Sequence, residues 1–349
     1  MMTYKCYEDI KGQASAWKAA LRTVDERIED VRGIIARSDA RMLFTSCGSP
    51  YFLGLATATL WREKLGMEVS VAPSSEVMLF PDATLPCDGN PFLVIATRSG
   101  ETTETVRALE KFSARFFGQA VVIGCRPGST LDEMADVPIT IPEAYDDVIP
   151  QTRSFGSMYL AAQYTAALLA GDEELINSLK SLPEILPDLL YRWEREVRSL
   201  AEEDWDSAVF LGGGPLYGIA TEASLKLIEM SLTKATSYHT LEVRHGPRSV
   251  VDERTLVVGL GSRRGARHEN QVLAELSRGS RVIKLAPDGD GSRNGNILEI
   301  GVGREVSEHA LGMLYLPLLQ LLAYHRAVHR GVDPDESHNL TSYVELTEG

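Results

Sequence analysis

The stretch FLVIATRSGET, residues 92–102, decides the fold. Its apolar run, residues 92–96, is typical of a buried strand, and the small polar residues after it predict a turn that opens a helix over about 103–115. The same order of strand, turn and helix begins at RMLFTSCGSP (41–50), and further strand-like runs follow at 67–72 and 120–124. Strands that alternate with helices predict a parallel α/β sheet.

The second half of the chain repeats this order. AVFLGGGP (208–215) and TLVVGLGSRRG (255–265) each join a strand to a helix, and a strand is expected at 281–285. An offset of 165 maps Gly48 to Gly213 and Gly100 to Gly265. We therefore expect two tandem α/β domains, each a parallel sheet flanked by helices in a flavodoxin-like three-layer sandwich. The expected parts are a helical segment at 1–35, a first domain at 36–171, a helical linker at 172–200, and a second domain with a C-terminal tail at 201–349.

Composition narrows the class of protein. The chain has 349 residues, with 35 Lys and Arg against 49 Asp and Glu, a net charge of −14. Such an acidic chain is a poor ligand for nucleic acid or an anionic membrane. The four cysteines form no CxxC pair, no apolar signal segment opens the chain, and the most apolar run, 310–324, is too short to span a bilayer. A cytoplasmic location is expected.

The turn at 97–102 suits an anion. Backbone N–H groups at the start of a helix lack partners and favour negative charge, and Gly100 allows a ligand to approach the backbone. Thr97, Ser99 and Thr102 can donate hydrogen bonds to phosphate, and Arg98 can add charge. The alternative is that Ser99 or Thr102 merely caps the helix. No GxGxxG or P-loop pattern is present, which disfavours a dinucleotide-dependent enzyme.

A polar stripe runs along the helix expected at 220–234. At about 100° per residue, Glu222, Lys226 and Glu229 fall on one narrow line between apolar faces. A carboxylate between apolar walls is a candidate general base. The alternative for Glu222 and Lys226 is a surface ion pair at i,i+4. His245, before the Gly-Pro pair at 246–247, is either a proton carrier or an ordinary loop histidine.

Five segments together resemble the sugar isomerase (SIS) superfamily in its double-domain form. They are SCGSPY (46–51), TRSGETTET (97–105), QTRSF (151–155), FLGGGPLYGIATEASLKLIEMS (210–231) and LEVRHGP (241–247), and the tail HNLTSYVEL (338–346) also fits. The chain is similar to the isomerase half of glutamine:fructose-6-phosphate amidotransferase. It is also similar to tagatose-6-phosphate ketose/aldose isomerases and amino-sugar-6-phosphate deaminases.

This resemblance implies roles for individual residues. Substrate and phosphate binding falls to Gly48, Ser49, Thr97, Arg98, Ser99 and Thr102. Proton transfer between C1 and C2 falls to Glu229, and opening of the sugar ring to His245, which the family donates from the neighbouring subunit. A homodimer or a dimer of dimers is therefore implied. Lys226 and Glu222 line the site in support, and neither a metal nor an organic cofactor is implied.

Three positions depart from the amidotransferase pattern. Pro50 stands in place of a hydroxyl residue, Arg98 in place of Gln, and Ser342 in place of a tail lysine. With no glutaminase segment expected, the resemblance implies isomerisation or deamination of a hexose-6-phosphate or amino-hexose-6-phosphate. The alternatives are a fructosamine-6-phosphate deglycase and a non-catalytic phosphosugar sensor.

Overall fold

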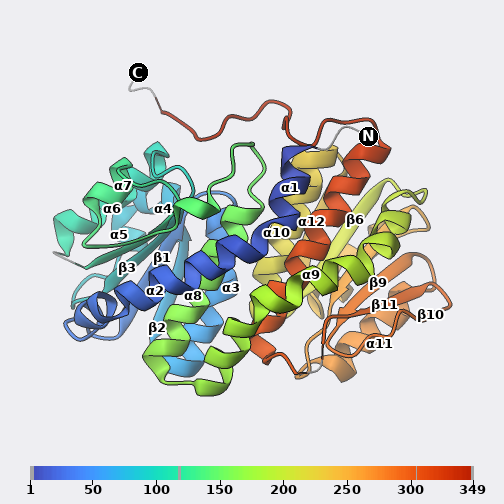
Figure 1. Ribbon diagram of the computed structural model, residues 1–349, viewed down its shortest axis with the longest axis horizontal. Helices are drawn as coiled ribbons and strands as arrows, with labels where there is room; N and C mark the ends of the chain where they lie inside the picture. The colour runs from blue at the N-terminus through green and yellow to red at the C-terminus, as the bar shows by residue number, and fades with distance from the viewer. Residues whose placement is uncertain (1–3, 117–118, 304, 347–349) are drawn as a thin grey trace. The chain divides into compact units, whose positions relative to one another are not determined.

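The computed structural model describes residues 4–116, 119–303 and 305–346, in two compact units (Figure 1). The first unit comprises Gly12–Lys180 and the tail from Asn339, and the second comprises Ser181–His338 and the N-terminal residues up to Lys11. Each unit is a sheet with helices around it.

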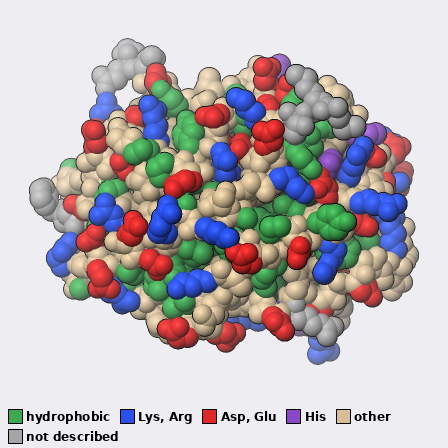
Figure 2. Space-filling view, in the orientation of Figure 1, with side chains coloured by type: hydrophobic (Ala, Val, Ile, Leu, Met, Phe, Trp, Pro, Cys, Tyr) green, Lys and Arg blue, Asp and Glu red, His purple; other side chains and the backbone are tan. Residues whose placement is uncertain are grey.

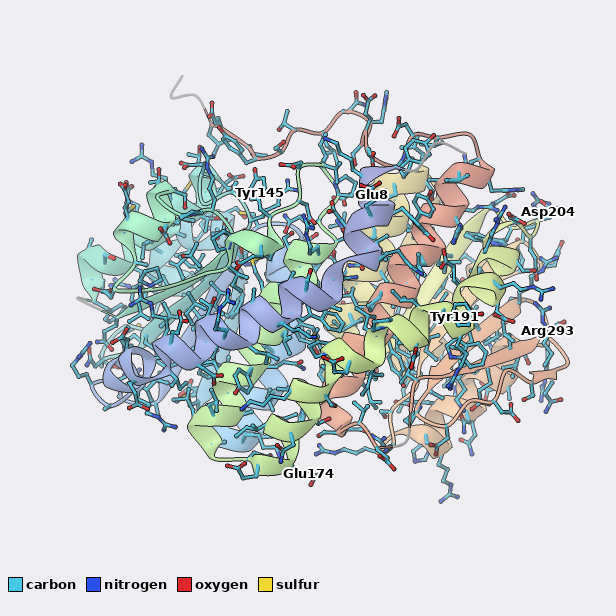
Figure 3. All side chains as sticks on the ribbon, in the orientation of Figure 1. Glu8, Tyr145, Glu174, Tyr191, Asp204 and Arg293 are labelled. Carbon is cyan, nitrogen blue, oxygen red and sulfur yellow. The ribbon has the colours of Figure 1, made fainter. Side chains whose placement is uncertain are left out.

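These units are defined by which residues pack together, and their bounds differ from the domain ranges expected from the sequence. The helical segment expected at 1–35 is broken at Gly12 into α1 (Lys5–Lys11) and α2 (Gln13–Ile35). The backbone N–H groups of Lys5 and Cys6 donate to the Asp335 carboxylate, which holds α1 in the second unit. The expected linker is helix α9 (Glu173–Ala201), and the boundary between the units falls inside it. In α9, Tyr191 is 87% exposed (Figure 3).

The sheet of the first unit has five parallel strands in the order β2-β1-β3-β4-β5. The strands are β1 (Arg41–Ser46), β2 (Glu68–Pro73), β3 (Phe92–Thr97), β4 (Ala120–Gly124) and β5 (Val137–Thr140). This is the flavodoxin-like order, in which the direction of chain progression reverses between β1 and β3. Ligands in such sheets bind at the carboxyl ends of the strands beside that reversal.

Helices cover both faces of this sheet. On one face, Leu109 and Phe112 of α6 (Thr103–Arg115) join Leu93 and Ile95 of β3 in a buried apolar cluster. Besides α2, the unit also contains the helices α3 (Ser49–Leu65), α4 (Ser74–Leu79), α5 (Pro81–Thr84), α7 (Thr130–Met134) and α8 (Arg153–Ala170). A Cβ on Gly54 of α3 would meet the Phe44 ring at 2.3 Å, so α3 packs closely on β1. The predicted three-layer α/β fold is confirmed.

The sheet of the second unit has the order β10-β11-β9-β8-β6-β7 and is parallel except for β10. Its strands are β6 (Ser207–Gly212), β7 (Lys234–His239), β8 (Thr255–Leu260), β9 (Arg281–Ala286), β10 (Arg293–Asn294) and β11 (Ile297–Gly301). Its further helices are α10 (Pro215–Ser231), α11 (Ala266–Leu276) and α12 (Leu311–His329). The sheet is therefore mixed, because the short edge strand β10 runs antiparallel.

The two halves do not superpose at the single offset of 165. From β1 to β6 and from α3 to α10 the offset is 166 residues, whereas from β3 to β8 and from α6 to α11 it is 163. Gly48 therefore corresponds to Gly214, and both cap their helices with left-handed backbone at φ 60° and 54°. Gly100 corresponds to Arg263 rather than to Gly265. The segment between the first and second strand–helix pairs is three residues shorter in the second copy, so no single offset fits both pairs.

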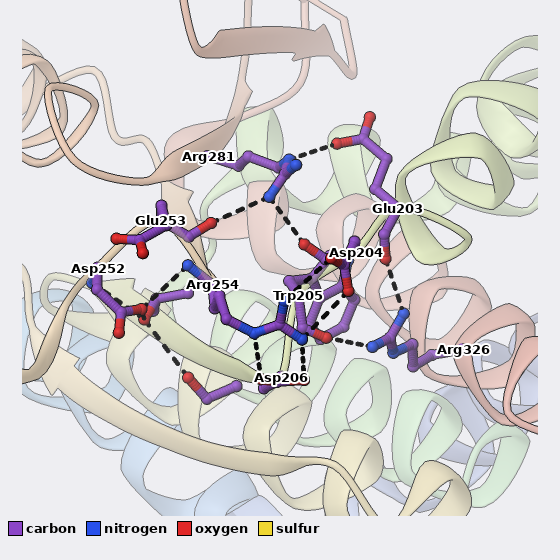
Figure 4. Close-up of polar contacts among 11 residues, drawn as sticks. Glu203, Asp204, Trp205, Asp206, Asp252, Glu253, Arg254, Arg281 and Arg326 are labelled. Atoms are coloured by element: carbon purple, nitrogen blue, oxygen red, sulfur yellow. Dashed lines mark hydrogen bonds and ion pairs between the residues drawn. The ribbon is translucent and has the colours of Figure 1, made fainter.

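An ion-pair network lies at the start of β6 and β8 in the second unit (Figure 4). Arg254 pairs with Asp204 and Asp206 on the surface, where such pairs contribute about 0–1 kcal/mol each. Arg326 of α12 is buried, with its guanidinium 3.9 Å from the ring centre of Trp205. It donates to the backbone carbonyl of Ala201, the last residue of α9, and to those of Glu203 and Trp205 in the segment between α9 and β6. This cation therefore fixes α12 to the entry of the sheet.

The surface is mixed in charge. On the face drawn in Figure 2, acidic and basic side chains are interspersed and do not gather by sign. Among the described residues, no helix combines the length and the apolar character that crossing a bilayer needs.

Candidate functional site

A polar hollow lies in the first unit where β1 and β3 end, at the reversal of the sheet order. Ten residues line it: Ser46, Cys47, Pro50, Thr97, Arg98, Ser99, Thr102, Thr105, Gln151 and Ser342. None of them is acidic. The structure thus brings together the four predicted anion-binding residues, Thr97, Arg98, Ser99 and Thr102.

Hydrogen bonds to its own side-chain hydroxyls fix the conformation of the turn after β3. Thr97 Oγ1 accepts from the Gly100 N–H at 3.0 Å, and Ser99 Oγ accepts from the Glu101 N–H at 3.2 Å. Gly100 has φ 71°, and a Cβ there would lie 1.9 Å from Ser129 Oγ, so only glycine fits. Thr102 is the N-cap residue of α6 but makes no side-chain capping bond. Neither Ser99 nor Thr102 therefore caps the helix with its side chain, contrary to the simpler interpretation.

Arg98 is committed to backbone carbonyls. Its Nη1 donates to Val148 O at 2.5 Å and Ile149 O at 2.9 Å, and its Nη2 donates to Ser342 O at 2.9 Å. Its side chain is buried, with the residue only 3% exposed. Within the described parts of the chain, Arg98 forms no ion pair and its Nε has no hydrogen-bond partner.

The hollow also has residues that the sequence did not single out. Four such residues line it: Ser46, Cys47, Thr105 and Gln151. The one signal in the sequence that could have identified them is their position inside the quoted motifs. The Cys47 thiol accepts from Thr105 Oγ1 at 3.4 Å, and burial raises the pKa of that thiol.

Gly48 and Ser49 do not contribute to this lining as described. Gly48 supplies the left-handed turn before α3, and Ser49, 4% exposed, is the first residue of the helix. Both lie directly between the lining residues Cys47 and Pro50. Their predicted contact with substrate stays a prediction.

The polar stripe of α10 lies in the second unit and is buried. The Lys226 side chain is 1% exposed and that of Glu222 is 0% exposed, with Nζ to Oε1 at 3.6 Å. Lys226 Nζ also donates to Glu229 Oε2, and the Glu229 side chain is 15% exposed. The pair Glu222–Lys226 is therefore not a surface ion pair. Glu229 is the one carboxylate of the stripe that solvent or a ligand reaches.

His245 is exposed at the end of the short helix η2 (Glu242–Arg244). Arg244 anchors this segment through bonds to the Glu275 carboxylate at 2.7 and 3.1 Å. Over the residues that the structure covers, the His245 ring makes no hydrogen bond or ion pair. Among the described residues, no hydrogen bond or ion pair links His245 to Glu229.

The matching turn in the second unit is filled by the chain itself. Glu269 accepts from the Ser262 N–H at 2.8 Å and from Ser262 Oγ at 2.7 Å, and Glu308 accepts from the Arg263 N–H at 3.0 Å. Burial raises the pKa of Glu269. The hollow beside this turn is lined by three acidic residues, Glu269, Asp288 and Glu299. Of these two turns, as far as the structure describes them, the one in the first unit has the hollow that no carboxylate lines.

The geometry so far defines a tandem α/β protein with a polar hollow at the switch point of its first sheet. The family model for the SIS domain matches residues 34–168 and 203–330, one match on each half of the chain. The chain belongs to the SIS domain family.

Curated relatives of the chain include glutamine–fructose-6-phosphate aminotransferases. The glutamine–fructose-6-phosphate aminotransferases (isomerizing) of Vibrio cholerae and Thermotoga maritima are each 28% identical, over 86% and 91% of this chain. The chain spans about half the length of these relatives, 50% and 54%.

Two solved structures share the fold. Tagatose-6-phosphate ketose/aldose isomerase from Escherichia coli has a TM-score of 0.86 at 23% identity, with 99% of this chain and 96% of that chain covered. Glucosamine-6-phosphate deaminase from Thermotoga maritima has a TM-score of 0.80 at 24% identity, with 98% and 100% covered.

Proposed function

We propose that this protein is an enzyme that binds a hexose-6-phosphate or amino-hexose-6-phosphate and moves a proton between C1 and C2. The reaction is an aldose–ketose isomerisation, a deamination, or both. The observation that carries the proposal is the hollow at the end of β3. It is lined by hydroxyls and a buried arginine and by no acidic side chain. Membership of a family with relatives that act on sugar phosphates supports the same substrate class.

The phosphate is the anchor in this mechanism. The hydroxyls of Thr97, Ser99 and Thr102 donate to its oxygens, and the positive charge of Arg98 favours a dianion. Anchoring far from the reacting carbons uses binding energy to position C1 and C2.

Glu229 is the proposed general base. It removes the proton next to the open-chain carbonyl, giving an enediol or an enolamine, and returns it to the neighbouring carbon. Lys226 holds the carboxylate of Glu229 by a direct hydrogen bond, while burial fixes the lysine in place. Glu222, one turn earlier on α10, lies 3.6 Å from the same ammonium and supports its position.

His245 is the proposed acid–base group that opens the sugar ring. Its ring is exposed on a segment anchored by Arg244, which suits donation to the site of a second copy of the chain. The proposal thus includes a homodimer or a dimer of dimers.

A ¹H NMR time course in D₂O tests the proposal. Glucosamine-6-phosphate, galactosamine-6-phosphate, fructose-6-phosphate and tagatose-6-phosphate are each incubated with the protein while ammonia is assayed. Deuterium at C1 or C2 of one of them is the expected result, and ammonia release then selects deamination over isomerisation. A fructosamine-6-phosphate is incubated in the same way, and exchange in that compound alone would shift the proposal to a deglycase. Binding of these sugars without any exchange over hours would replace it with a phosphosugar sensor.

A further inference from the structure

Arg98 connects three segments that are far apart in the sequence. Its guanidinium reaches the loop before α8 through Val148 O and Ile149 O, and the C-terminal tail through Ser342 O. All three acceptors are neutral carbonyls. The arginine itself belongs to the anion-binding turn, so the turn, the loop and the tail share one side chain.

The tail has a second attachment at the same turn. The Thr103 N–H, the first of α6, donates to Val344 O at 3.1 Å, and the Leu346 N–H donates to Thr103 Oγ1 at 3.1 Å. Ser342 lines the hollow, and Gln151 does so from the loop. The loop and the tail that Arg98 contacts thus each supply one residue to the wall around the proposed phosphate.

The charge of Arg98 lacks a counter-ion in the described chain. A buried cation without an anion is costly, because carbonyl dipoles replace only part of its hydration. The Arg98 side chain is only 3% exposed, and its Nε is buried without a hydrogen-bond partner. The residue nevertheless lines the hollow. An anion in the hollow would supply the missing charge and would stabilise the guanidinium in the place where it holds the tail.

We propose that Arg98 is a positioning residue that couples anion binding in the hollow to docking of the tail, residues 339–346. The identity of the anion as a sugar phosphate rests on the proposed function, whereas the coupling does not. Coupling between two equilibria is reciprocal. If anion binding favours docking of the tail by some factor, then undocking of the tail lowers the affinity for the anion by the same factor.

Hydrogen–deuterium exchange of the tail amides with and without inorganic phosphate tests this coupling. In the unaltered protein, phosphate should slow exchange across 340–346, and Arg98→Gln should abolish that slowing. The matched control is Arg107→Gln, an exposed arginine of α6 in the same unit, which should keep it. Slowing that persists in Arg98→Gln overturns the proposal.

Two further variants separate coupling from loss of the fold or of charge. Thr103→Val removes the acceptor for the Leu346 N–H but leaves Arg98 in place, and it should weaken phosphate binding while the far-UV spectrum is unchanged. Arg98→Lys keeps the charge but cannot supply the planar fork that reaches three carbonyls, so it should recover phosphate affinity more than tail protection. Unchanged phosphate affinity in Thr103→Val contradicts the coupling.

The kinetic consequence distinguishes this role from the proposed function. Loss of hydrogen bonds to a charged group costs roughly tenfold or more in affinity. Arg98→Gln should therefore raise KM for the phosphosugar at least tenfold with a smaller change in kcat. If the unaltered protein binds phosphate but its tail exchange does not respond, the coupling fails and the proposed function stands. If it binds neither phosphate nor a sugar phosphate, the proposed function fails.

Discussion

Replacement of Lys226 by Met should strongly destabilise the second unit. The Lys226 side chain is 1% exposed, and the Glu222 side chain beside it is 0% exposed. The substitution keeps the apolar volume but leaves the carboxylates without their ammonium. Breaking a buried ion pair from one side costs about 3–5 kcal/mol. At about 2–4 °C per kcal/mol for a unit of this size, the melting temperature should fall by roughly 6–20 °C.

The assay is thermal unfolding followed by circular dichroism. The double variant Lys226→Met with Glu222→Gln should recover part of the loss, because it removes a buried carboxylate charge together with its ammonium.

The matched control is Lys234→Met, which removes an exposed lysine of the same unit. It should change the melting temperature by a degree or two at most, since surface charges contribute about 0–1 kcal/mol. If Lys226→Met costs no more than this control, or if the double variant recovers none of the loss, the argument from burial is wrong.

Two more predictions concern the first unit. Gly100→Ala should lower the free energy of unfolding by more than Gly128→Ala and should weaken phosphate binding, measured by denaturant unfolding and calorimetry. Both glycines have positive φ, at a cost of about 1–2 kcal/mol for Ala, but only at Gly100 would the new Cβ collide with Ser129. Equal losses would contradict the contact. Iodoacetamide at pH 8 should alkylate exposed Cys87 first, whereas Cys125 should react only after unfolding, because burial raises the pKa of its thiol and leaves little thiolate. Rapid labelling of Cys125 in the folded protein, read by mass spectrometry of peptides, would contradict this.

The fold was largely predictable because its signals are local. Buried strands such as β3 are continuous apolar runs, and the helices after them open at glycine-containing turns. Sequence pattern could not place the tail from Asn339, which was expected with the second domain but packs with the first unit. It is held there by Arg98 and Thr103, and the tail contributes only backbone atoms to these hydrogen bonds, which leave no pattern in the side chains of the tail.

The site was predictable only in part. The hydroxyls of the turn at 97–102 and the stripe on α10 follow from spacing, and the structure brings each set together. The environment of Arg98 does not follow from spacing, because its partners are main-chain carbonyls 50 or more residues away in sequence. The same holds for Glu308, which reaches the second turn from a short 3-10 helix (Glu308–Ala310) 45 residues away in sequence.

The most direct test of the central claim is deuterium exchange by Glu229→Gln. The variant is incubated in D₂O with the sugar phosphate that the unaltered protein processes, and exchange at C1 and C2 is followed by ¹H NMR beside a binding titration. Glu253→Gln, an exposed glutamate of the same unit, is the matched control. We expect Glu229→Gln to bind the phosphosugar with near-unaltered affinity and to lose exchange by at least a hundredfold, as removal of a general base does, while the control keeps both. Exchange at the unaltered rate in Glu229→Gln would show that another group moves the proton.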